Sequence, residues 1–215
     1  MLILASASPR RRQLLTTLGV EFDVRPADVD EGEPPGVGAE RYVYDTAAAK
    51  AEAVAATASP DDLVIGSDTI VLAGLRALGK PRDRAEVEMT LRQMAGLTVE
   101  VLTAVSVAQG GDGGRIDRLS RSTCVIAELS EAELAAYLDS GVWEDKAGGL
   151  AVQHTDPAVI TEVIGCRANV VGLPICDVAA VLRLAGVADV VAPACHPAGL
   201  TCVVDARTAT VDPCS

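Results

Sequence analysis

The chain has 215 residues, of which 49% are hydrophobic but only 2% are aromatic, and its formal net charge is -12 at pH 7. This length is enough for one generous domain or for two lobes that share a core, and the core must be built mainly from Ala, Val, Leu and Ile. The acidic balance argues against general binding to a nucleic-acid backbone, because the overall field repels phosphates. It leaves room for a small anionic ligand where basic residues gather.

The start of the sequence does not have the pattern of a signal peptide. The short apolar run at residues 1–5 meets Arg10, Arg11 and Arg12 almost at once, which is the reverse of the order in a signal peptide. No apolar stretch approaches the length that spans a bilayer. We therefore expect a cytoplasmic protein with reduced cysteines, and neither a membrane nor nucleic acid among its partners. The six cysteines all fall in the second half, at positions 124, 166, 176, 195, 202 and 214.

The hydrophobic pattern predicts alternating strands and helices in the first half of the chain. Ser8 is expected to be the N-cap of the first helix, with Pro9 as its first residue and Gly19 at its end. An acidic loop rich in Pro and Gly, 28–38, precedes the second helix. In chain order, the expected elements are a strand at 2–5, a helix at 8–19, a strand at 21–25, a long helix at 39–58, and a buried strand at 63–66 that 70–72 either continues or pairs with.

The second half predicts a hairpin and further helices. Asp83 with Glu86, and Ser130 with Glu133, have the spacing of a capping box, so each pair is expected to open a helix. The hairpin is expected to consist of a strand at 99–108 and a second strand that ends near 127. The other expected elements are strands at 150–153 and 159–164 and a helix at 174–184. This order indicates a mixed α/β (α+β) sheet covered by helices. From Gly186 onward the pattern is lost, and only 200–204 looks like a strand.

Two hydroxyl groups and two guanidinium groups gather where the first strand meets the first helix. The segment Ser6-Ala7-Ser8-Pro9-Arg10-Arg11 opens that helix, where free backbone N–H groups and the helix dipole favour an anion. Arginine adds planar, bidentate donors that suit phosphate oxygens. An ordinary capped helix with a solvated basic turn explains the same residues, and the local sequence leaves both interpretations open.

Lys50 is the second candidate, because the spacing of Val43, Ala47, Lys50 and Val54 puts it on the apolar face of the long helix. A lysine in such a place binds an anionic ligand, pairs with a buried carboxylate, or extends its amine to the edge of the apolar face. The last of these three explanations is the commonest for a single lysine.

Three more charged positions lie in loops or at a predicted strand end. Asp68, in Gly66-Ser67-Asp68-Thr69, is expected at the end of an apolar strand, where a carboxylate can hold a metal or deprotonate water. Strand-end aspartates also form ordinary turns. Lys80 follows Gly79 and precedes Pro81 in a stiff loop, and the acidic loop contributes Asp30, Glu31 and Glu33, most of whose charges are expected to be solvated.

Other nucleotide and metal chemistries find little support in the sequence. No Gly-x-x-x-x-Gly-Lys-[Ser/Thr] loop occurs, which excludes a P-loop nucleoside triphosphatase. The only two histidines, His154 and His196, do not form a pair at helical spacing, so a zinc-hydrolase site is not indicated. A metal site in the C-terminal segment is not favoured either, because its potential ligands are irregularly spaced: Cys195, His196, Cys202 and Cys214.

Eight short segments occur in the order in which they occur in one known family. They are Ser6-Ala7-Ser8-Pro9-Arg10-Arg11, Asp30-Glu31, Lys50-Ala51, Gly66-Ser67-Asp68-Thr69, Gly79-Lys80-Pro81, Leu102-Thr103-Ala104-Val105, Asp145-Lys146-Ala147-Gly148 with Gln153, and Asn169-Val170-Val171-Gly172-Leu173-Pro174. Over roughly residues 2–185 the chain therefore resembles the Maf family of nucleotide pyrophosphatases.

The resemblance implies a fold, an activity and a domain organisation. The fold would have two α/β lobes around an extended mixed sheet, similar to the ITP pyrophosphatase-like fold, with a nucleotide cleft between the lobes. Residues 1–186 would form the Maf-like domain, and 187–215 a cysteine-containing tail of unknown role. The activity would be hydrolysis of a nucleoside triphosphate to the monophosphate and pyrophosphate, in a homodimer. The Asp-Lys-Ala-Gly pattern with Gln153 is similar to the branch that acts on dTTP and UTP.

The resemblance also implies roles for particular residues. Asp68 would be the general base that acts on water, and Glu31 with Asp68 would hold a divalent metal, Mg²⁺ or Mn²⁺. Lys50 and Lys80 would neutralise the triphosphate. The substrate-binding positions would be Ser6, Ser8, Arg10, Arg11, Thr69 and Gln153, of which Arg10, Thr69 and Gln153 match positions tied to substrate choice.

The chain departs from the family pattern in places, and these departures leave two alternatives open. Leu97-Thr98-Val99 stands where the family usually has Arg-Thr-His, and His154 stands where a glycine is usual. The first alternative is a non-catalytic nucleotide-binding regulator of septum formation in cell division. The second treats the cysteine-containing tail as a metal or redox module attached to an inactive core.

Overall fold

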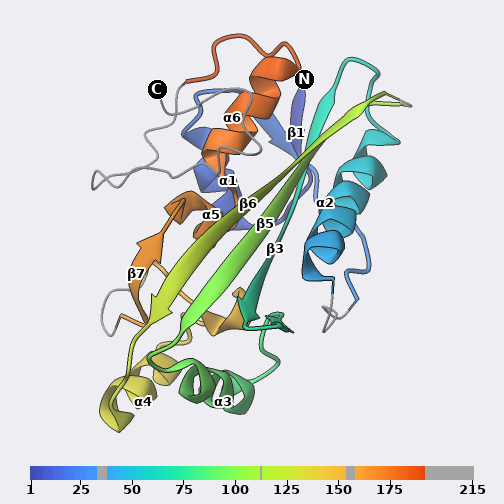
Figure 1. Ribbon diagram of the computed structural model, residues 1–215. Coiled ribbons are helices and arrows are strands. Elements are labelled where there is room, and N and C mark those ends of the chain that lie inside the picture. The colour runs from blue at the N-terminus through green and yellow to red at the C-terminus, as the bar shows by residue number, and fades with distance from the viewer. Residues whose placement is uncertain (33–37, 112, 154–157, 192–215) are drawn as a thin grey trace.

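A mixed sheet of seven strands runs the length of the molecule (Figure 1). The computed structural model describes residues 1–32, 38–111, 113–153 and 158–191. In chain order the strands are β1 (Leu2–Leu4), β2 (Phe22–Val24), β3 (Leu63–Ala73), β4 (Arg76–Leu78), β5 (Thr98–Gln109), β6 (Arg115–Ile126) and β7 (Ile160–Ile164). Their order across the sheet is β2-β1-β3-β5-β6-β7, with β4 paired to β3. β1 is parallel to β2 and β3 and the other pairs are antiparallel, so the expected mixed α/β sheet is confirmed.

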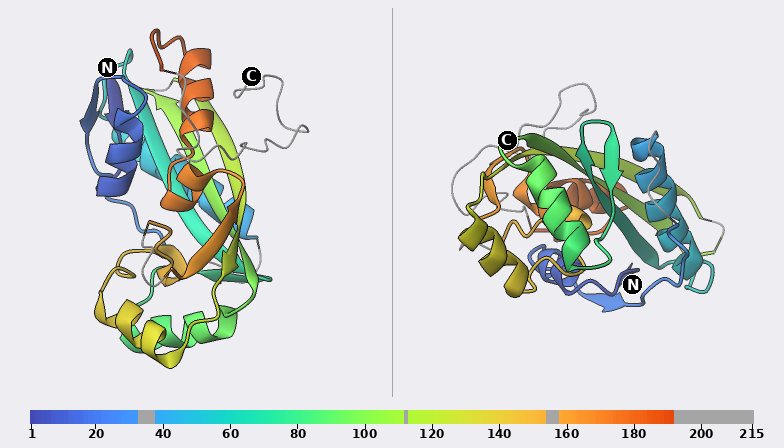
Figure 2. Two further views of the ribbon diagram at one scale, coloured as in Figure 1. Left: turned by 90° about the vertical axis from the view of Figure 1, so that its left-hand side faces the viewer. Right: turned by 90° about the horizontal axis from the view of Figure 1, so that it is seen from below.

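Helices cover both faces of the sheet and one of its ends (Figures 1 and 2). They are α1 (Pro9–Thr16), α2 (Ala39–Ala55), α3 (Arg84–Met94), α4 (Glu131–Asp139), the short 3-10 helix η1 (Ala147–Gly149), α5 (Arg167–Val171) and α6 (Ile175–Leu184). Because neighbouring side chains of a strand point to opposite faces, β1 contributes to two cores. Leu2 and Leu4 pack in one core with the α1 and α6 side chains, whereas Ile3 packs in another with those of α2.

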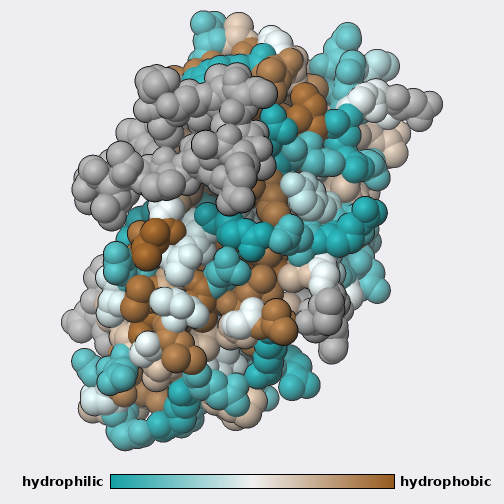
Figure 3. All heavy atoms as spheres, in the orientation of Figure 1, coloured by the Kyte–Doolittle hydropathy of each residue, from teal (hydrophilic) through white to brown (hydrophobic). Residues whose placement is uncertain are grey.

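The far end of the sheet has its own core, closed by α3 and α4. Side chains from both helices pack there with those of β5, and Tyr137 is the largest of the fully buried side chains. Both helices begin as the sequence predicts: the Asp83 carboxylate accepts a hydrogen bond from the Glu86 N–H, and Ser130 forms a complete capping box. Figure 3 shows hydrophilic residues over the outer surface of this end.

The predicted strand end at Asp68 is wrong, because β3 is one continuous strand of 11 residues with Asp68 in its middle. The two neighbouring strands differ in length. β1 pairs with β3 only from Leu63 to Ile65, whereas β5 pairs with it as far as Leu72. Between Ile65 and Val71, where β4 begins to pair, the β1 side of β3 is therefore left without a strand, and Asp68 lies in this gap just past the carboxyl end of β1.

The predicted strand at 150–153 is also wrong. Gly148 and Gly149 just before it have positive φ angles of 61° and 68°, which turn the chain away from an extended course. The Tyr137 hydroxyl then donates to the Gly149 carbonyl at 2.6 Å and accepts from the Ala151 N–H at 3.0 Å, so a buried side chain replaces a strand partner. The apolar Leu150 and Ala151 are buried in the α3–α4 core.

The last described residues return to the turn that follows α1. The Val191 N–H donates to the Leu18 carbonyl at 3.0 Å. Residues 192–215 lie outside the described residues, and so do the expectations placed on His154, His196 and the three cysteines of the tail. Cys124 and Cys166 are buried, as expected of small core residues, but Cys176 is disulfide-bonded, contrary to the expectation of reduced thiols. Within the described ranges, every helix is too short or too polar to cross a bilayer.

Candidate active site

The amine of Lys50 lies between two carboxylates. Its Nζ is 2.8 Å from Oδ1 of Asp68 and 2.8 Å from Oε1 of Glu31. Lys50 is 7% exposed and Asp68 is 5% exposed, so this ion pair is buried. Of the three explanations for a lysine on the apolar helix face, the structure contains the buried carboxylate, and the amine does not extend to solvent.

A glycine on β3 allows α2 to come close enough for this contact. A Cβ atom on Gly66 would lie 2.2 Å from the Ala47 carbonyl oxygen and 2.6 Å from the Ala51 nitrogen. The helix backbone therefore rests directly on the strand, and only glycine leaves that space. Lys50 is buried on this face of α2, together with its predicted neighbours, and reaches Asp68 two residues beyond Gly66.

The two carboxyl groups beside Lys50 are shifted in opposite directions. Burial raises the pKa of Asp68, although the charges of Lys50 and Arg11 oppose that rise. Partial burial also acts to raise the pKa of Glu31, but its hydrogen bond to Lys50 and the charges of Lys50, Lys80 and Arg11 together lower it. Neighbouring acids whose pKa values are pushed apart suit different tasks at one pH, one taking up a proton and the other staying ionised.

Arg11 connects the start of α1 to β3. Ser8 is the N-cap, as predicted, and its hydroxyl accepts from the Arg11 backbone N–H at 3.4 Å. The Arg11 guanidinium donates to the Ser6 hydroxyl at 3.3 Å, to the Thr69 hydroxyl at 3.3 Å and to the Gly172 carbonyl at 2.9 Å. Four of the predicted substrate-binding positions, Ser6, Ser8, Arg11 and Thr69, are therefore linked by hydrogen bonds.

Arg10 turns to a different part of the chain. Its guanidinium donates to the Asp145 carbonyl at 2.9 Å, and Asp145 has a positive φ of 57° although it is not a glycine. The next residue, Lys146, is a second cation at this place. Burial lowers the pKa of Lys146, and the Arg10 charge lowers it further. Its amine donates to the carbonyls of Val142 and Glu144.

Lys80 and Gln153 make weaker links to the site. Lys80 is exposed, and its charge is among those that lower the pKa of Glu31. Its loop is fixed by the Gly148 N–H, which donates to the Gly79 carbonyl at 2.8 Å. Gln153 is exposed, and within the described part of the chain no hydrogen bond joins it to the residues around Lys50.

Sequence reasoning gave no role to several residues that the structure brings to the site. Thr103 and Asn169 are fully buried beneath Thr69, and the Gly172 carbonyl holds Arg11. All three lie in segments that matched the family pattern. A hydroxyl inside the apolar segment Leu102–Val105 was the available signal for Thr103, and a cation within the Asp145–Gly148 segment was the signal for Lys146.

The carboxylates fit the metal that the resemblance implies. Glu31 and Asp68 approach the same Lys50 amine, so their oxygens lie near each other, and hard divalent cations such as Mg²⁺ prefer oxygen ligands. Magnesium sites commonly use one or two carboxylates and complete the shell with water and substrate phosphates. No larger group of three or more His, Cys, Asp or Glu residues spaced for a metal occurs within the described ranges.

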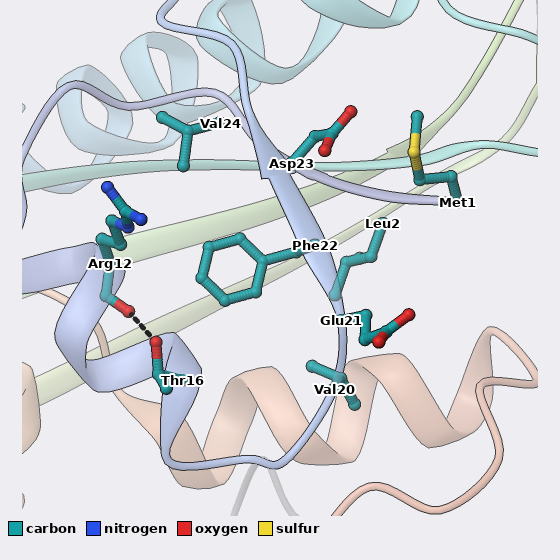
Figure 4. A pocket seen from close by; sticks show the side chains of 9 residues that line it. All are labelled: Met1, Leu2, Arg12, Thr16, Val20, Glu21, Phe22, Asp23 and Val24. Carbon is teal, nitrogen blue, oxygen red and sulfur yellow. Dashed lines mark hydrogen bonds between the residues drawn. The ribbon is translucent and has the colours of Figure 1, made fainter.

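A hollow on the described surface lies elsewhere, between α1 and the edge strand β2 (Figure 4). It measures about 890 Å³ and is lined by Met1, Leu2, Arg12, Thr16, Val20, Glu21, Phe22, Asp23 and Val24. The Phe22 ring points toward α1. One arginine and two carboxylates line this hollow, so it lacks the excess of positive charge that a triphosphate requires. The hydrogen-bonded cluster around Lys50 and Arg11 is the better site for such a ligand.

Comparison with known proteins agrees with the resemblance. The chain matches the family described as Maf-like protein over residues 1–185. A dTTP/UTP pyrophosphatase of Anaeromyxobacter dehalogenans is 44% identical over 187 residues, which cover 86% of this chain and 94% of that protein. A dTTP/UTP pyrophosphatase of Cereibacter sphaeroides is 45% identical over 191 residues, covering 86% and 95%. Among solved structures, the Staphylococcus aureus Ham1 protein is 18% identical, with a TM-score of 0.40 over 59% of this chain and 72% of that one. The family match and the two relatives show that this chain belongs to the Maf-like protein family.

Proposed function

We propose that this protein hydrolyses nucleoside triphosphates to the monophosphate and pyrophosphate, and that dTTP and UTP are its preferred substrates. The observation that carries the proposal is the ion-pair cluster of buried Lys50 and Asp68 with the exposed Glu31, beside the Arg11 guanidinium. The names of the two relatives, both above 40% identity, support the same reaction and the same nucleotides.

The reaction begins when a water molecule attacks the α-phosphorus. The bond from that phosphorus to the oxygen bridging the α- and β-phosphates breaks, and pyrophosphate leaves. Asp68 is assigned as the base that takes the proton from the water. The burial that raises the pKa of Asp68 supports this role, because a carboxylate with a raised pKa is a stronger base than an ordinary one.

The substrate phosphates are bound by the cations of the cluster. Lys50 and Lys80 are assigned to offset the charge of the triphosphate and of the departing pyrophosphate. The hydroxyls of Ser6 and Ser8 and the guanidinium groups of Arg10 and Arg11 are assigned to hold the phosphate oxygens at the start of α1. Thr69, Gln153 and Arg10 are assigned to the choice of substrate.

Glu31 and Asp68 are assigned as the ligands of a divalent cation, Mg²⁺ or Mn²⁺. When bound, such a cation polarises the phosphate oxygens and offsets the charge that develops on them. We further propose that the protein acts in the cytoplasm and that it is a homodimer. Light scattering of the purified protein tests the oligomeric state.

Release of both products from a nucleotide panel tests the proposed reaction. Purified protein is incubated with Mg²⁺ or Mn²⁺ and dTTP, UTP, CTP, GTP or ITP, and pyrophosphate and the matching monophosphate are measured. We expect metal-dependent release of both products, fastest with dTTP or UTP. We also expect Asp68→Asn to reduce turnover by about three orders of magnitude, since it removes the base and a metal ligand.

Asp62→Asn is the matched control, because Asp62 is also buried but bonds the N-terminal amine and the Ser59 N–H, away from the cluster. We expect it to retain turnover. Normal turnover in Asp68→Asn would refute the assigned base. A wild-type protein that binds nucleotides and releases no product would be the non-catalytic regulator instead.

A further inference from the structure

The Arg11 guanidinium is fixed in place by three segments that are far apart in the sequence. Its Nη1 donates to Ser6 at 3.3 Å, its Nη2 to Thr69 at 3.3 Å and its Nε to the Gly172 carbonyl at 2.9 Å. The Gly172 carbonyl also accepts from the Ser67 hydroxyl at 3.2 Å. These acceptors determine in which direction the remaining N–H groups of Arg11 point, and so how the side chain meets a phosphate.

The orientation of the Thr69 hydroxyl is determined by Thr103, a residue that does not bond Arg11. The Thr103 hydroxyl donates to the Asn169 carbonyl at 3.0 Å, and a hydroxyl has only one proton to donate. In its 3.0 Å contact with Thr69, Thr103 must therefore be the acceptor and Thr69 the donor. With its proton directed at Thr103, the Thr69 oxygen presents a lone pair to Arg11. The donor and acceptor of each hydrogen bond in the series follow: Arg11 donates to Thr69, Thr69 donates to Thr103, and Thr103 donates to the Asn169 carbonyl.

The last two residues of this hydrogen-bond series, Thr103 and Asn169, are fixed to the sheet. Thr103 and Asn169 are both 0% exposed. The Asn169 side-chain NH₂ group donates to the Val101 carbonyl at 3.0 Å and to the Ser122 hydroxyl at 2.9 Å, on neighbouring strands β5 and β6. These bonds fix α5 on the sheet and thereby place the Asn169 and Gly172 carbonyls. The Asn169 Oδ1 atom has no hydrogen-bond partner among the described residues, but rotation of the Asn169 NH₂ group or of the Thr103 hydroxyl would leave a buried donor unpaired, which opposes it.

We propose that Thr103 is a positioning residue of the active site, whose hydroxyl orients the Arg11 guanidinium toward the phosphates through Thr69. The proposal rests on the proposed function, and it goes beyond it by giving a role to a residue too deeply buried to meet the substrate. It also gives Thr69 a defined part. Because the Thr69 proton is used inside the protein, Thr69 faces its surroundings as a hydrogen-bond acceptor.

Removal of the Thr103 hydroxyl tests this role. In Thr103→Val, the Thr69 proton loses its acceptor, so Thr69 is free to rotate and no longer offers Arg11 a fixed lone pair. We expect kcat/KM for dTTP to fall about tenfold, mainly through a higher KM, and the dissociation constant of inorganic pyrophosphate to rise by a similar factor. Thr103→Ser keeps the hydroxyl and is expected to restore both values to within about twofold of the wild type.

A double-mutant cycle with Arg11→Lys separates positioning from a general loss of structure. If Thr103 acts through the arginine, Thr103→Val adds no further loss of kcat/KM to the Arg11→Lys protein. Ser106→Ala is the matched control, because Ser106 is a buried hydroxyl on the same strand that bonds Asp117 instead. We expect wild-type KM for the control. Additive losses in the cycle, or an unchanged KM in a folded Thr103→Val protein, would overturn the proposal.

Pyrophosphate binding distinguishes failure of this proposal from failure of the proposed function. If the wild type binds pyrophosphate but turns over no nucleotide, the reaction is wrong, and a weaker affinity in Thr103→Val, absent in Ser106→Ala, still supports the positioning role. If the wild type turns over dTTP and Thr103→Val matches it in KM and in pyrophosphate affinity, the positioning role alone is refuted. Calorimetric titration measures that affinity in each variant.

Discussion

Two cations of this site are held in different ways. Lys50 is bound by two carboxylates, so its charge is paired inside the protein. Arg11 is bound by two hydroxyls and a carbonyl, all neutral, and within the described ranges no carboxylate lies at ion-pair distance from it. Burial lowers the pKa of Arg11, with the more distant charges of Asp68 and Glu31 opposing that effect.

The difference indicates a division of labour. A lysine paired with carboxylates holds them in place and has only part of its charge left for the triphosphate, whereas an arginine held by neutral groups keeps its full charge available for an incoming anion. The comparison predicts that changes at Lys50 act on both stability and activity, and that changes at Arg11 act mainly on the binding of phosphates.

The largest effect is expected for Lys50→Met, which keeps the unbranched side chain as far as Cε and removes its amine and charge. Asp68 would then be a buried carboxylate without its partner, which destabilises a protein by about 3–5 kcal/mol. We expect urea unfolding to show a loss of that size, together with loss of pyrophosphate release. Arg41→Met on the same helix, where Arg41 forms an exposed pair with Asp45, is the control and should unfold like the wild type. Equal stability of the two variants would contradict the paired role of Lys50.

Arg11→Lys is expected to have a smaller effect on stability and a clear effect on binding. The charge remains, but a single amine cannot make three bonds in the planar geometry of a guanidinium. We expect kcat/KM for dTTP to fall about 30- to 100-fold, equivalent to about 2–3 kcal/mol. The unfolding midpoint should change little. A large loss of stability with an unchanged KM would reverse the comparison between the two cations.

Gly66→Ala tests the contact that brings Lys50 to its partners. The added Cβ would lie 2.2 Å from the Ala47 carbonyl oxygen, so α2 must move away from β3. We expect a loss of about 1–3 kcal/mol in the free energy of unfolding, and a lower kcat as Lys50 moves away from Asp68. Gly114→Ala has open space around its new Cβ and provides the control. Wild-type stability in Gly66→Ala would show that the helix does not depend on this close approach.

The smallest effect is expected in the pH dependence of Glu31. Because its folded pKa is lowered, Glu31 contributes stability at pH values above its unfolded pKa, and that contribution is lost as the pH falls through the folded pKa. Asp68 has the opposite sign: its folded pKa is raised, so its contribution decreases as the pH rises toward the folded pKa. Urea unfolding of the metal-free wild type and of Glu31→Gln between pH 3 and pH 8 measures the contribution of Glu31 to the free energy of unfolding. The two proteins should converge at the acid end, and a constant difference across the range would contradict the assigned shift.

Local patterns predicted most helices and long strands correctly. Ser8, Asp83 and Ser130 cap helices as their spacing indicates, because a cap depends on residues three positions apart. The failures came where a distant partner decided the outcome. Asp68 lies within a long strand because β5 extends past β1, and 150–153 is not a strand because Tyr137 takes the place of a partner.

The sequence by itself determined the residue types of the site, the apolar helix face that carries Lys50, and the resemblance to the family to which the chain belongs. The tertiary structure alone decided which groups meet. Arg11 reaches Thr69 across 58 positions and Gly172 across 161, and no local pattern encodes contacts at such separations. Thr103 and Asn169 stood in the matched segments without a role, because a buried hydrogen-bond network becomes visible only when the strands and helices that hold its members are packed together.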